Sequence, residues 1–368
     1  MLLGPLEGFA IGMTADRRAE EQGELLRRRG AKVVHGPSIR TIPLADDERL
    51  AAATASLLEA PPDVVVLLTG LGTRGWFAAA EGLGVDDALR RSLSRARVIA
   101  RGPKAAGAAL GATLDVAWQA ATETSEEVLD RLRAEGVRGL RIAVQRDGGA
   151  TAVLRDALAA LGAEVVDVPV YRWTTPDDPE PALRLVEAAC DRRLDAITFT
   201  SSPAVENLLA LAAEAGLDLA FRDALATSVR VACVGPVCAA TAARAGLTDV
   251  VQPRRARLGA MVQALVRAFE HRTLTFPLGG VEVRLQGATA VVGERSVSLS
   301  PRERGVLEVL GQEPGRVVSK AELLRALWGD GDPHTVEVTV ARLRRRLGPP
   351  GRALRALPRR GYVLDLTG

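Results

Sequence analysis

An arginine-rich segment near the end of the chain is the clearest candidate for chemistry. Thr335-Val-Glu-Val-Thr-Val-Ala-Arg-Leu-Arg-Arg-Arg-Leu347 places apolar residues at helical spacing, and the basic segment Pro358-Arg-Arg-Gly-Tyr-Val363 follows it. Residues 335–360 contain eight arginines and one carboxylate, Glu337, whereas the whole chain has a net charge of only +3. This uneven distribution predicts a local patch that binds nucleic acid.

A helical wheel divides this segment into two faces. Val336, Val340, Leu343 and Leu347 form one apolar stripe, which we expect to face a core. The opposite face is predicted to contact base edges in the major groove of double-stranded DNA, and it holds Thr335, Thr339, Arg342, Arg345 and Arg346. Arg344 lies on the flank with Glu337, which favours a structural or phosphate contact. Arg359, Arg360 and Tyr362 are predicted to form a wing that touches the DNA backbone or minor groove.

The flanking sequence predicts the elements that position this helix. Short alternating strands are expected over 281–299, with a turn at Gly293. Ser300-Pro-Arg-Glu303 has the pattern of a helix-capping box, and Ser319-Lys-Ala-Glu322 starts a second helix in the same way. Asp332-Pro333 precedes the arginine-rich helix. The prediction is a linker over 269–280 and a three-helix domain over 281–368.

These motifs, in this order and spacing, resemble the OmpR/PhoB-type winged helix-turn-helix. The matching segments are Leu299-Ser-Pro-Arg-Glu303, Gly315-Arg-Val-Val-Ser-Lys-Ala-Glu-Leu323, Trp328-Gly, Thr335-Val-Glu-Val-Thr-Val-Ala-Arg-Leu-Arg-Arg and Arg360-Gly-Tyr362. The resemblance implies a DNA-binding domain. Because one winged helix contacts DNA over a modest area, a homodimer on DNA is an expected arrangement.

The rest of the chain is internally duplicated. Gly30-Ala-Lys-Val-Val resembles Gly162-Ala-Glu-Val-Val, Asp63-Val-Val-Val matches Asp195-Ala-Ile-Thr, and Arg101-Gly-Pro-Lys matches Val234-Gly-Pro-Val. The offset is about 132 residues each time, which indicates two related domains. β-Branched runs alternate with helical segments, so each domain is predicted to be α/β with a parallel sheet.

Ligands of such sheets bind outside the carboxyl ends of the strands, where amide groups at helix starts attract anions. The loops concerned are 69–74, 100–104, 145–151, 200–203 and 234–238. We predict a site for a small anionic ligand, and its candidate residues are Arg17, Gly70, Gly72, Thr73, Arg101, Lys104, Arg146, Thr200, Ser201, Ser202, Gly235 and Pro236. Alternatively, Gly70 and Gly72 serve only a tight turn, and the basic residues are solvated. Gly70-Leu-Gly-Thr-Arg-Gly75 fits a dinucleotide pattern, but no acidic residue follows the next strand, so no cofactor is predicted.

The paired Thr-Ser and Gly-Pro loops, together with Gly162-Ala-Glu-Val-Val-Asp-Val-Pro-Val-Tyr-Arg172, resemble uroporphyrinogen-III synthase over residues 8–268. The resemblance implies a double crossover, with domain one at 1–38 and 173–268 and domain two at 39–172. It implies a tetrapyrrole in the cleft and cyclisation of hydroxymethylbilane without cofactor or metal. Tyr171 matches the family's tyrosine and would be catalytic if the module is active. Family hydroxyls are missing at about Ala105 and after Pro236.

The sequence therefore predicts two related parallel-sheet α/β domains and a C-terminal winged helix. The first functional hypothesis is a transcription regulator whose synthase-like module senses a small anionic ligand, such as a tetrapyrrole. The alternative is an active synthase with an autoregulatory DNA-binding domain, and a third hypothesis is an unrelated anion-binding enzyme. No long apolar run, leader-like segment or metal-ligand spacing is present, so a cytoplasmic protein with no membrane partner and no metal is expected.

Overall fold

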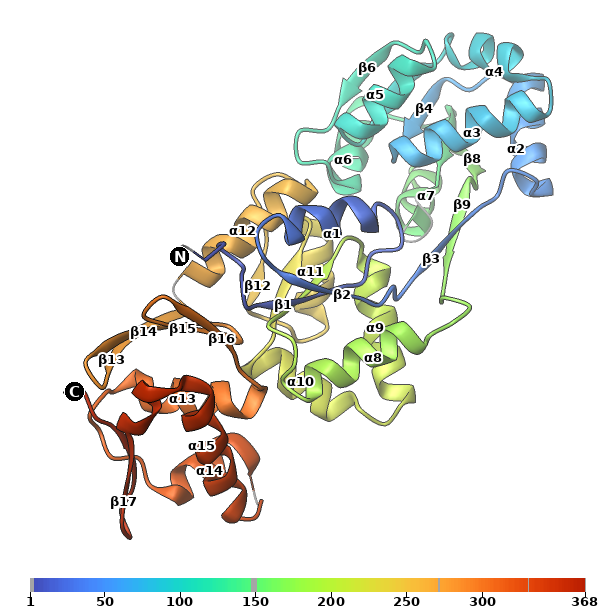
Figure 1. Ribbon diagram of the computed structural model, residues 1–368. Helices are drawn as coiled ribbons and strands as arrows, with labels where there is room; N and C mark the ends of the chain where they lie inside the picture. The colour runs from blue at the N-terminus through green and yellow to red at the C-terminus, as the bar shows by residue number, and fades with distance from the viewer. Residues whose placement is uncertain (1–2, 147–150, 271, 330, 368) are drawn as a thin grey trace. The chain divides into compact units, whose positions relative to one another are not determined.

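The computed structural model describes residues 3–146, 151–270, 272–329 and 331–367. The chain forms two compact units (Figure 1). Unit 1 comprises Met1–Ser38 and Pro176–Gly368, and unit 2 comprises Ile39–Thr175.

Unit 2 is built on a five-stranded sheet of order β6-β5-β4-β7-β8, in which all neighbours are parallel. Strands β3 and β9, the first and last elements of the unit along the chain, pair antiparallel with each other. Its elements are β3 (Arg40–Pro43), α2 (Glu48–Glu59), β4 (Val64–Leu67), α3 (Gly70–Gly82), α4 (Asp86–Leu93), β5 (Arg97–Ala100), α5 (Pro103–Gly111), β6 (Val116–Gln119), α6 (Ser125–Glu135), β7 (Arg141–Gln145), α7 (Thr151–Ala160), β8 (Glu164–Val168) and β9 (Tyr171–Thr174). The four residues of β4 are all buried, as expected for a strand covered on both faces.

The α/β part of unit 1 repeats this design with a parallel sheet of order β12-β11-β10-β1-β2. Its elements are β1 (Ala10–Met13), α1 (Ala19–Arg27), β2 (Lys32–His35), α8 (Glu180–Cys190), β10 (Ala196–Phe199), α9 (Ser202–Glu214), α10 (Asp218–Thr227), β11 (Arg230–Cys233), α11 (Pro236–Arg244), β12 (Val250–Val251) and α12 (Leu258–Glu270). Helices α3 and α9 have equal length and start 132 residues apart. The predicted duplication is therefore present element by element.

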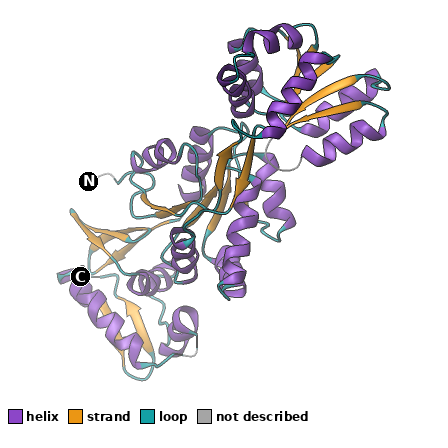
Figure 2. Ribbon diagram, turned by 90° about the vertical axis from the view of Figure 1, so that its right-hand side faces the viewer, coloured by secondary structure: helices purple, strands orange, loops and turns teal. Residues whose placement is uncertain are grey.

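The C-terminal part of unit 1 is a winged helix. Along the chain, a four-stranded antiparallel sheet precedes three helices and a hairpin. Figure 2 colours the helices and strands of the chain differently. The elements are β13 (Thr273–Leu278), β14 (Val281–Gln286), β15 (Thr289–Val292), β16 (Arg295–Ser298), α13 (Pro301–Gln312), α14 (Lys320–Trp328), α15 (His334–Leu347), the 3-10 helix η1 (Pro349–Ala353), β17 (Leu354–Leu357) and β18 (Gly361–Leu364).

The fold confirms the α/β class and the winged helix, and it corrects the predicted linker. Residues 273–278 of that linker form strand β13, paired antiparallel with β14. The reason is alternation: Phe276 and Leu278 are buried in the winged-helix core, while Thr275 and Pro277 are exposed. Only two residues separate α12 from β13.

Local sequence sets the helix starts as predicted. Ser300 caps α13 in a capping box, because its hydroxyl accepts from the Glu303 amide while the Glu303 carboxylate accepts from the Ser300 amide. Ser319 caps α14 through the Glu322 amide at 3.1 Å. These caps fix the two helices against which α15 packs.

Candidate nucleic-acid interface and ligand-binding loops

Helix α15 has one buried face and one basic face. Val336, Val340, Leu343 and Leu347 are each at most 1 % exposed and belong to the winged-helix core. Arg342 and Arg345 are exposed, and neither forms an ion pair within the described residues. We call these two side chains the recognition pair. Two unpaired guanidinium groups opposite a buried stripe have the geometry needed to reach guanine edges in a major groove.

Arg346, predicted to lie on the same face, is held by its own domain. Its Nε donates to Glu303 Oε1 at 3.0 Å, and its Nη1 donates to the Ser298 carbonyl at 3.0 Å. Arg344 also has a structural bond, because its Nε donates to the Leu354 carbonyl at 2.7 Å. The structure thus places Arg344 where the sequence favoured it, and it separates Arg346 from the recognition pair.

The predicted hydroxyl groups lie mostly inside the domain. Thr335 is half-buried, and Thr339 is 8 % exposed with its hydroxyl donating to the Thr335 carbonyl at 2.8 Å. Tyr362 is also 8 % exposed, and its backbone pairs with Val318. Burial raises the pKa of the Tyr362 phenol. Arg359 and Arg360 are exposed in the turn between β17 and β18, as expected for a wing.

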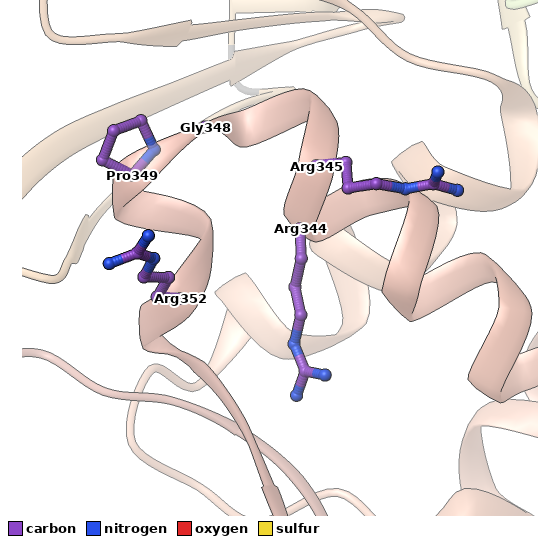
Figure 3. A pocket seen from close by; sticks show the side chains of 5 residues that line it. All are labelled: Arg344, Arg345, Gly348, Pro349 and Arg352. Carbon is purple, nitrogen blue, oxygen red and sulfur yellow. The ribbon is translucent and has the colours of Figure 1, made fainter.

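An open pocket lies beside the end of α15, and the sequence did not reveal it. Its volume is about 350 Å³, and Arg344, Arg345, Gly348, Pro349 and Arg352 line it. Figure 3 shows the three arginine side chains fanning out from α15 and η1, with Arg345 directed away from Arg344. Three arginine side chains that point in different directions are better placed to contact several phosphates of a DNA strand than to bind one isolated anion.

The carboxylate of Glu337, in the first turn of α15, is neutralised. Lys320 of α14 pairs with the Glu337 carboxylate, and His334 lies 3.1 Å from the same group. The hydrogen bond from Lys320 lowers the pKa of Glu337, and the pair raises the pKa of Lys320. The outer surface of the helix therefore carries net positive charge.

In unit 1, the predicted ligand-binding residues gather at the carboxyl ends of β10 and β11. Thr200, Ser201 and Ser202 precede and start α9, and Gly235 and Pro236 start α11. Ser202 Oγ lies 3.4 Å from the Val237 carbonyl, which joins the two loops. The buried Ser201 hydroxyl has no hydrogen-bond partner among the described residues. Arg17 is exposed in the loop after β1.

A buried polar cluster lies beneath these loops, and sequence reasoning missed it. Thr14, Gln22 and Thr198 are fully buried. Thr14 Oγ1 donates to the Thr198 carbonyl at 2.9 Å, and Gln22 Nε2 donates to Thr198 Oγ1 at 2.7 Å. Gln22 Oε1 accepts nothing within the described chain. A fully buried amide beside the ends of β1 and β10 fixes the shape of this edge and leaves one acceptor available.

In unit 2, Thr69 organises the loop after β4. Its hydroxyl accepts from the Gly72 amide at 2.9 Å, and its own amide donates to Gln145 Oε1 at 3.0 Å. The Thr73 hydroxyl donates to the Thr69 carbonyl at 2.9 Å, and the Tyr171 hydroxyl lies 3.5 Å from Thr69 Oγ1. Tyr171, Thr69 and Thr73 therefore meet, although Tyr171 itself is only 6 % exposed.

The basic residues predicted in unit 2 have partners. Arg146 pairs with Asp167 at 2.9 Å, and Arg101 Nη1 lies 3.5 Å from Ser125 Oγ. Lys104 lies in the first turn of α5, which starts at the carboxyl end of β5. Residues 147–150 of the predicted loop 145–151 lie outside the described residues.

Gly70 and Gly72 have packing reasons for lacking a side chain. A Cβ at Gly70 would lie 2.3 Å from the Lys104 carbonyl oxygen, and one at Gly72 would lie 1.9 Å from Gln145 Nε2. The close approach of α3 to α5 depends on the first of these glycines. The turn hypothesis therefore has direct support here, and a ligand contact through the Gly72 amide competes with the Thr69 cap.

Gly70→Ala is expected to destabilise the protein by about 1–3 kcal/mol, because the methyl group would meet backbone that cannot move aside. Gly107→Ala is the matched control in α5, since no described atom outside its chain neighbours and its own helix backbone lies within 4 Å of its Cβ position. The control should gain up to about 1 kcal/mol from helix propensity. Urea unfolding of both variants measures the difference, and equal stabilities would refute the packing assignment.

The described residues contain no group of three or more His, Cys, Asp or Glu side chains that could hold a metal ion. No helix in the described ranges is long and apolar enough to cross a membrane.

The fold is a duplicated α/β module fused to a winged helix whose third helix, α15, has an arginine-rich outer face. The chain belongs to the uroporphyrinogen-III synthase HemD family, whose model matches residues 20–263. A second model, for the C-terminal domain of transcriptional regulatory proteins, matches residues 293–364. The sequence-based resemblances to both families are thereby confirmed.

Individual proteins agree with both assignments. A variant of uroporphyrinogen III synthase from Thermus thermophilus, solved as a crystal structure, is 29 % identical; the match covers 72 % of this chain and 99 % of that one, with a TM-score of 0.59. A curated relative from Methanothermobacter thermautotrophicus, which bears a uroporphyrinogen-III synthase name, is 34 % identical over 142 residues, 39 % of this chain and 54 % of the relative. The phosphate regulon regulatory protein PhoB of Rhizobium meliloti is 39 % identical over 95 residues, 24 % of this chain and 42 % of PhoB. This chain thus spans about half the length of these two curated relatives.

Proposed function

We propose that this protein is a DNA-binding transcription regulator whose synthase-like module senses a small anionic ligand. The observation that carries the proposal is the recognition pair, Arg342 and Arg345, which is exposed, opposite a fully buried stripe, and forms no ion pair with any residue that the structure describes. Arginine is the side chain that binds guanine most often in a major groove. The fusion of a synthase-family module to a regulator's C-terminal domain supports the same function.

The ligand would bind at the carboxyl edges of the parallel sheets. Helices α9 and α11 present their amino ends there, and amide groups at helix starts attract carboxylates. Near this edge, the buried Ser201 hydroxyl and Gln22 Oε1 have no hydrogen-bond partner among the described residues. A tetrapyrrole with several carboxylates fits this chemistry. Its binding would favour one conformation of the module and thereby change DNA affinity.

Synthase activity is the alternative, and the family membership together with the Tyr171–Thr69 contact favours it. Three replaced residues favour the sensor. Ala105 is 1 % exposed where the family has a hydroxyl, and Val237 and Cys238 replace two family threonines, with Val237 at 55 % exposure and Cys238 buried. Of these three replacements, the exposed one at Val237 removes a hydroxyl that would help to orient a flexible linear substrate.

Supplying hydroxymethylbilane to the purified protein and separating the uroporphyrin isomers distinguishes the two functions. The sensor proposal predicts only the type I isomer, formed at the uncatalysed rate. Formation of the type III isomer above that rate would establish the synthase instead. In that event Tyr171→Phe should lower the rate, because it removes the hydroxyl beside Thr69.

The pocket at the end of α15 predicts the salt dependence of DNA binding. If about five phosphates are contacted, log affinity against log salt should have a slope of about −4 to −5. Arg352→Ala removes one lining cation without touching the recognition pair. It should reduce the slope by about one and weaken all DNA sequences equally. An unchanged slope would place the phosphate path elsewhere.

A further inference from the structure

A buried carboxylate lies at the amino ends of strands β1 and β10 in unit 1. Asp195, directly before β10, is 4 % exposed, and its Oδ2 accepts from the Ala10 amide at 2.8 Å. The duplication supplies a natural comparison, since Asp63 occupies the same place before β4. Asp63 Oδ2 accepts from the Arg141 amide at 2.8 Å, but Asp63 is exposed. The hydrogen bond from a backbone amide to the aspartate is therefore common to both repeats, whereas the burial of the carboxylate is found only at Asp195.

The winged helix accounts for that burial. Arg304, in the first turn of α13, donates from Nη1 to Asp195 Oδ1 at 2.5 Å and from Nε to Glu308 at 2.7 Å. The Arg304 and Asp195 side chains are only 18 % and 6 % exposed. Burial by itself would lower the pKa of Arg304, but Asp195 and Glu308 outweigh it and the pKa is raised. The Arg304 guanidinium is thus largely removed from water and hydrogen-bonded to two carboxylates.

A second contact joins the same two parts through their backbones. The Ala288 amide, in the turn between β14 and β15, donates to the Gly8 carbonyl at 2.7 Å. A Cβ on Gly287 would lie 2.4 Å from that carbonyl, and one on Gly8 would lie 2.2 Å from the Gln286 carbonyl. Two facing glycines, both with positive φ, permit this approach.

Gln286 completes the contact. The side chain is 5 % exposed, and its Nε2 donates to the carbonyls of Gly4 at 2.8 Å and Glu7 at 3.0 Å. Behind it, Phe9 stacks on Phe269 with ring centroids 4.4 Å apart. The turn between β14 and β15 thus contacts the segment directly before β1. Both polar contacts are satisfied and enclosed, which distinguishes them from a chance surface contact.

We propose that these contacts, which we call the joint, hold the winged helix on the α/β part of unit 1 as one rigid DNA-binding body. The joint covers the amino ends of β1 and β10, whereas the predicted ligand loops lie at their carboxyl ends. Where the chain acts as a ligand-dependent regulator, as proposed above, the signal does not release the winged helix. Ligand binding instead acts on the body as a whole, through unit 2 or through a second copy of the chain.

Hydrogen exchange of the Ala288 amide in the full chain tests the joint. The wild-type amide should be protected at least as strongly as those of β14. The double variant Arg304→Gln, Gln286→Ala should exchange at least tenfold faster at Ala288, while the amides of α15 stay protected and show that the winged helix is folded. Asp63→Asn is the matched control from the repeat, and it should leave the Ala288 amide unchanged.

An unprotected Ala288 amide in the wild type would overturn the joint, and so would a double variant indistinguishable from wild type. A third arm uses saturating uroporphyrinogen III and separates the joint from the sensor. Protection of Ala288 should persist with this probe present. Loss of protection on its addition would overturn the rigid body while supporting ligand sensing. A change in DNA affinity while the Ala288 amide stays protected would support both the joint and ligand sensing.

Discussion

Replacing Arg342 or Arg345 by alanine is expected to weaken binding to the preferred DNA by about 1–3 kcal/mol each. Both guanidinium groups are exposed, and neither forms an ion pair within the described residues. Their removal therefore costs no internal contact, and the loss should appear in base recognition. Affinity for the preferred duplex should fall more than affinity for a scrambled one, so the sequence preference relaxes. Fluorescence anisotropy titrations with both duplexes measure the two effects.

Arg346→Ala is the matched control for these variants. Arg346 is adjacent in sequence and has the same charge, but its guanidinium contacts Glu303 and the Ser298 carbonyl. Its replacement should lower stability slightly and leave the ratio of specific to non-specific affinity close to wild type. If Arg346→Ala lost as much specificity as Arg342→Ala and Arg345→Ala, the assignment of base recognition to Arg342 and Arg345 alone would be wrong.

Leu343→Ala should have the largest effect on folding. Leu343 is fully buried in the winged-helix core, so truncation leaves a cavity beneath the recognition pair. The expected loss in the free energy of unfolding is about 2–5 kcal/mol. Affinity should fall more for the preferred duplex than for a scrambled one, because α15 loses the position from which Arg342 and Arg345 reach base edges while its positive charge remains.

Leu366→Ala is the comparison for this core variant, because Leu366 is 39 % exposed. Its cost should stay within about 0.5 kcal/mol. Urea unfolding monitored by circular dichroism measures both variants. A Leu343→Ala protein as stable as Leu366→Ala would contradict the assigned core face.

Periodic and local patterns were enough to predict most of the fold. The repeat offset gave the duplicated sheets, the spacing of Val336, Val340, Leu343 and Leu347 gave the core stripe of α15, and Ser300 with Glu303 gave the capping box. Each of these three features depends on residues close in sequence or on a regular spacing along the chain. The predicted linker failed because Thr273–Leu278 is short and contains Pro277, yet it alternates as an edge strand does.

Contacts between distant segments could not be predicted. A helical wheel places Arg346 on the outer face, but Glu303 and Ser298 belong to elements more than forty residues earlier. The ring of Tyr362 enters the core because β18 bridges to Val318. Arg304 and Asp195 are 109 residues apart, and no local pattern links them. Such pairs are visible only once the chain is folded.

Binding titrations of the full chain with duplexes selected from a random pool, with and without uroporphyrinogen III, test DNA recognition and ligand sensing in one experiment. We expect a selected duplex to bind at least about 10³-fold more tightly than a scrambled one at physiological salt. We also expect uroporphyrinogen III to change that affinity by about 5–150-fold, the range of ordinary allosteric coupling. Equal affinity for selected and scrambled duplexes would contradict a DNA-reading function, and a specific affinity that uroporphyrinogen III leaves unchanged would contradict tetrapyrrole sensing.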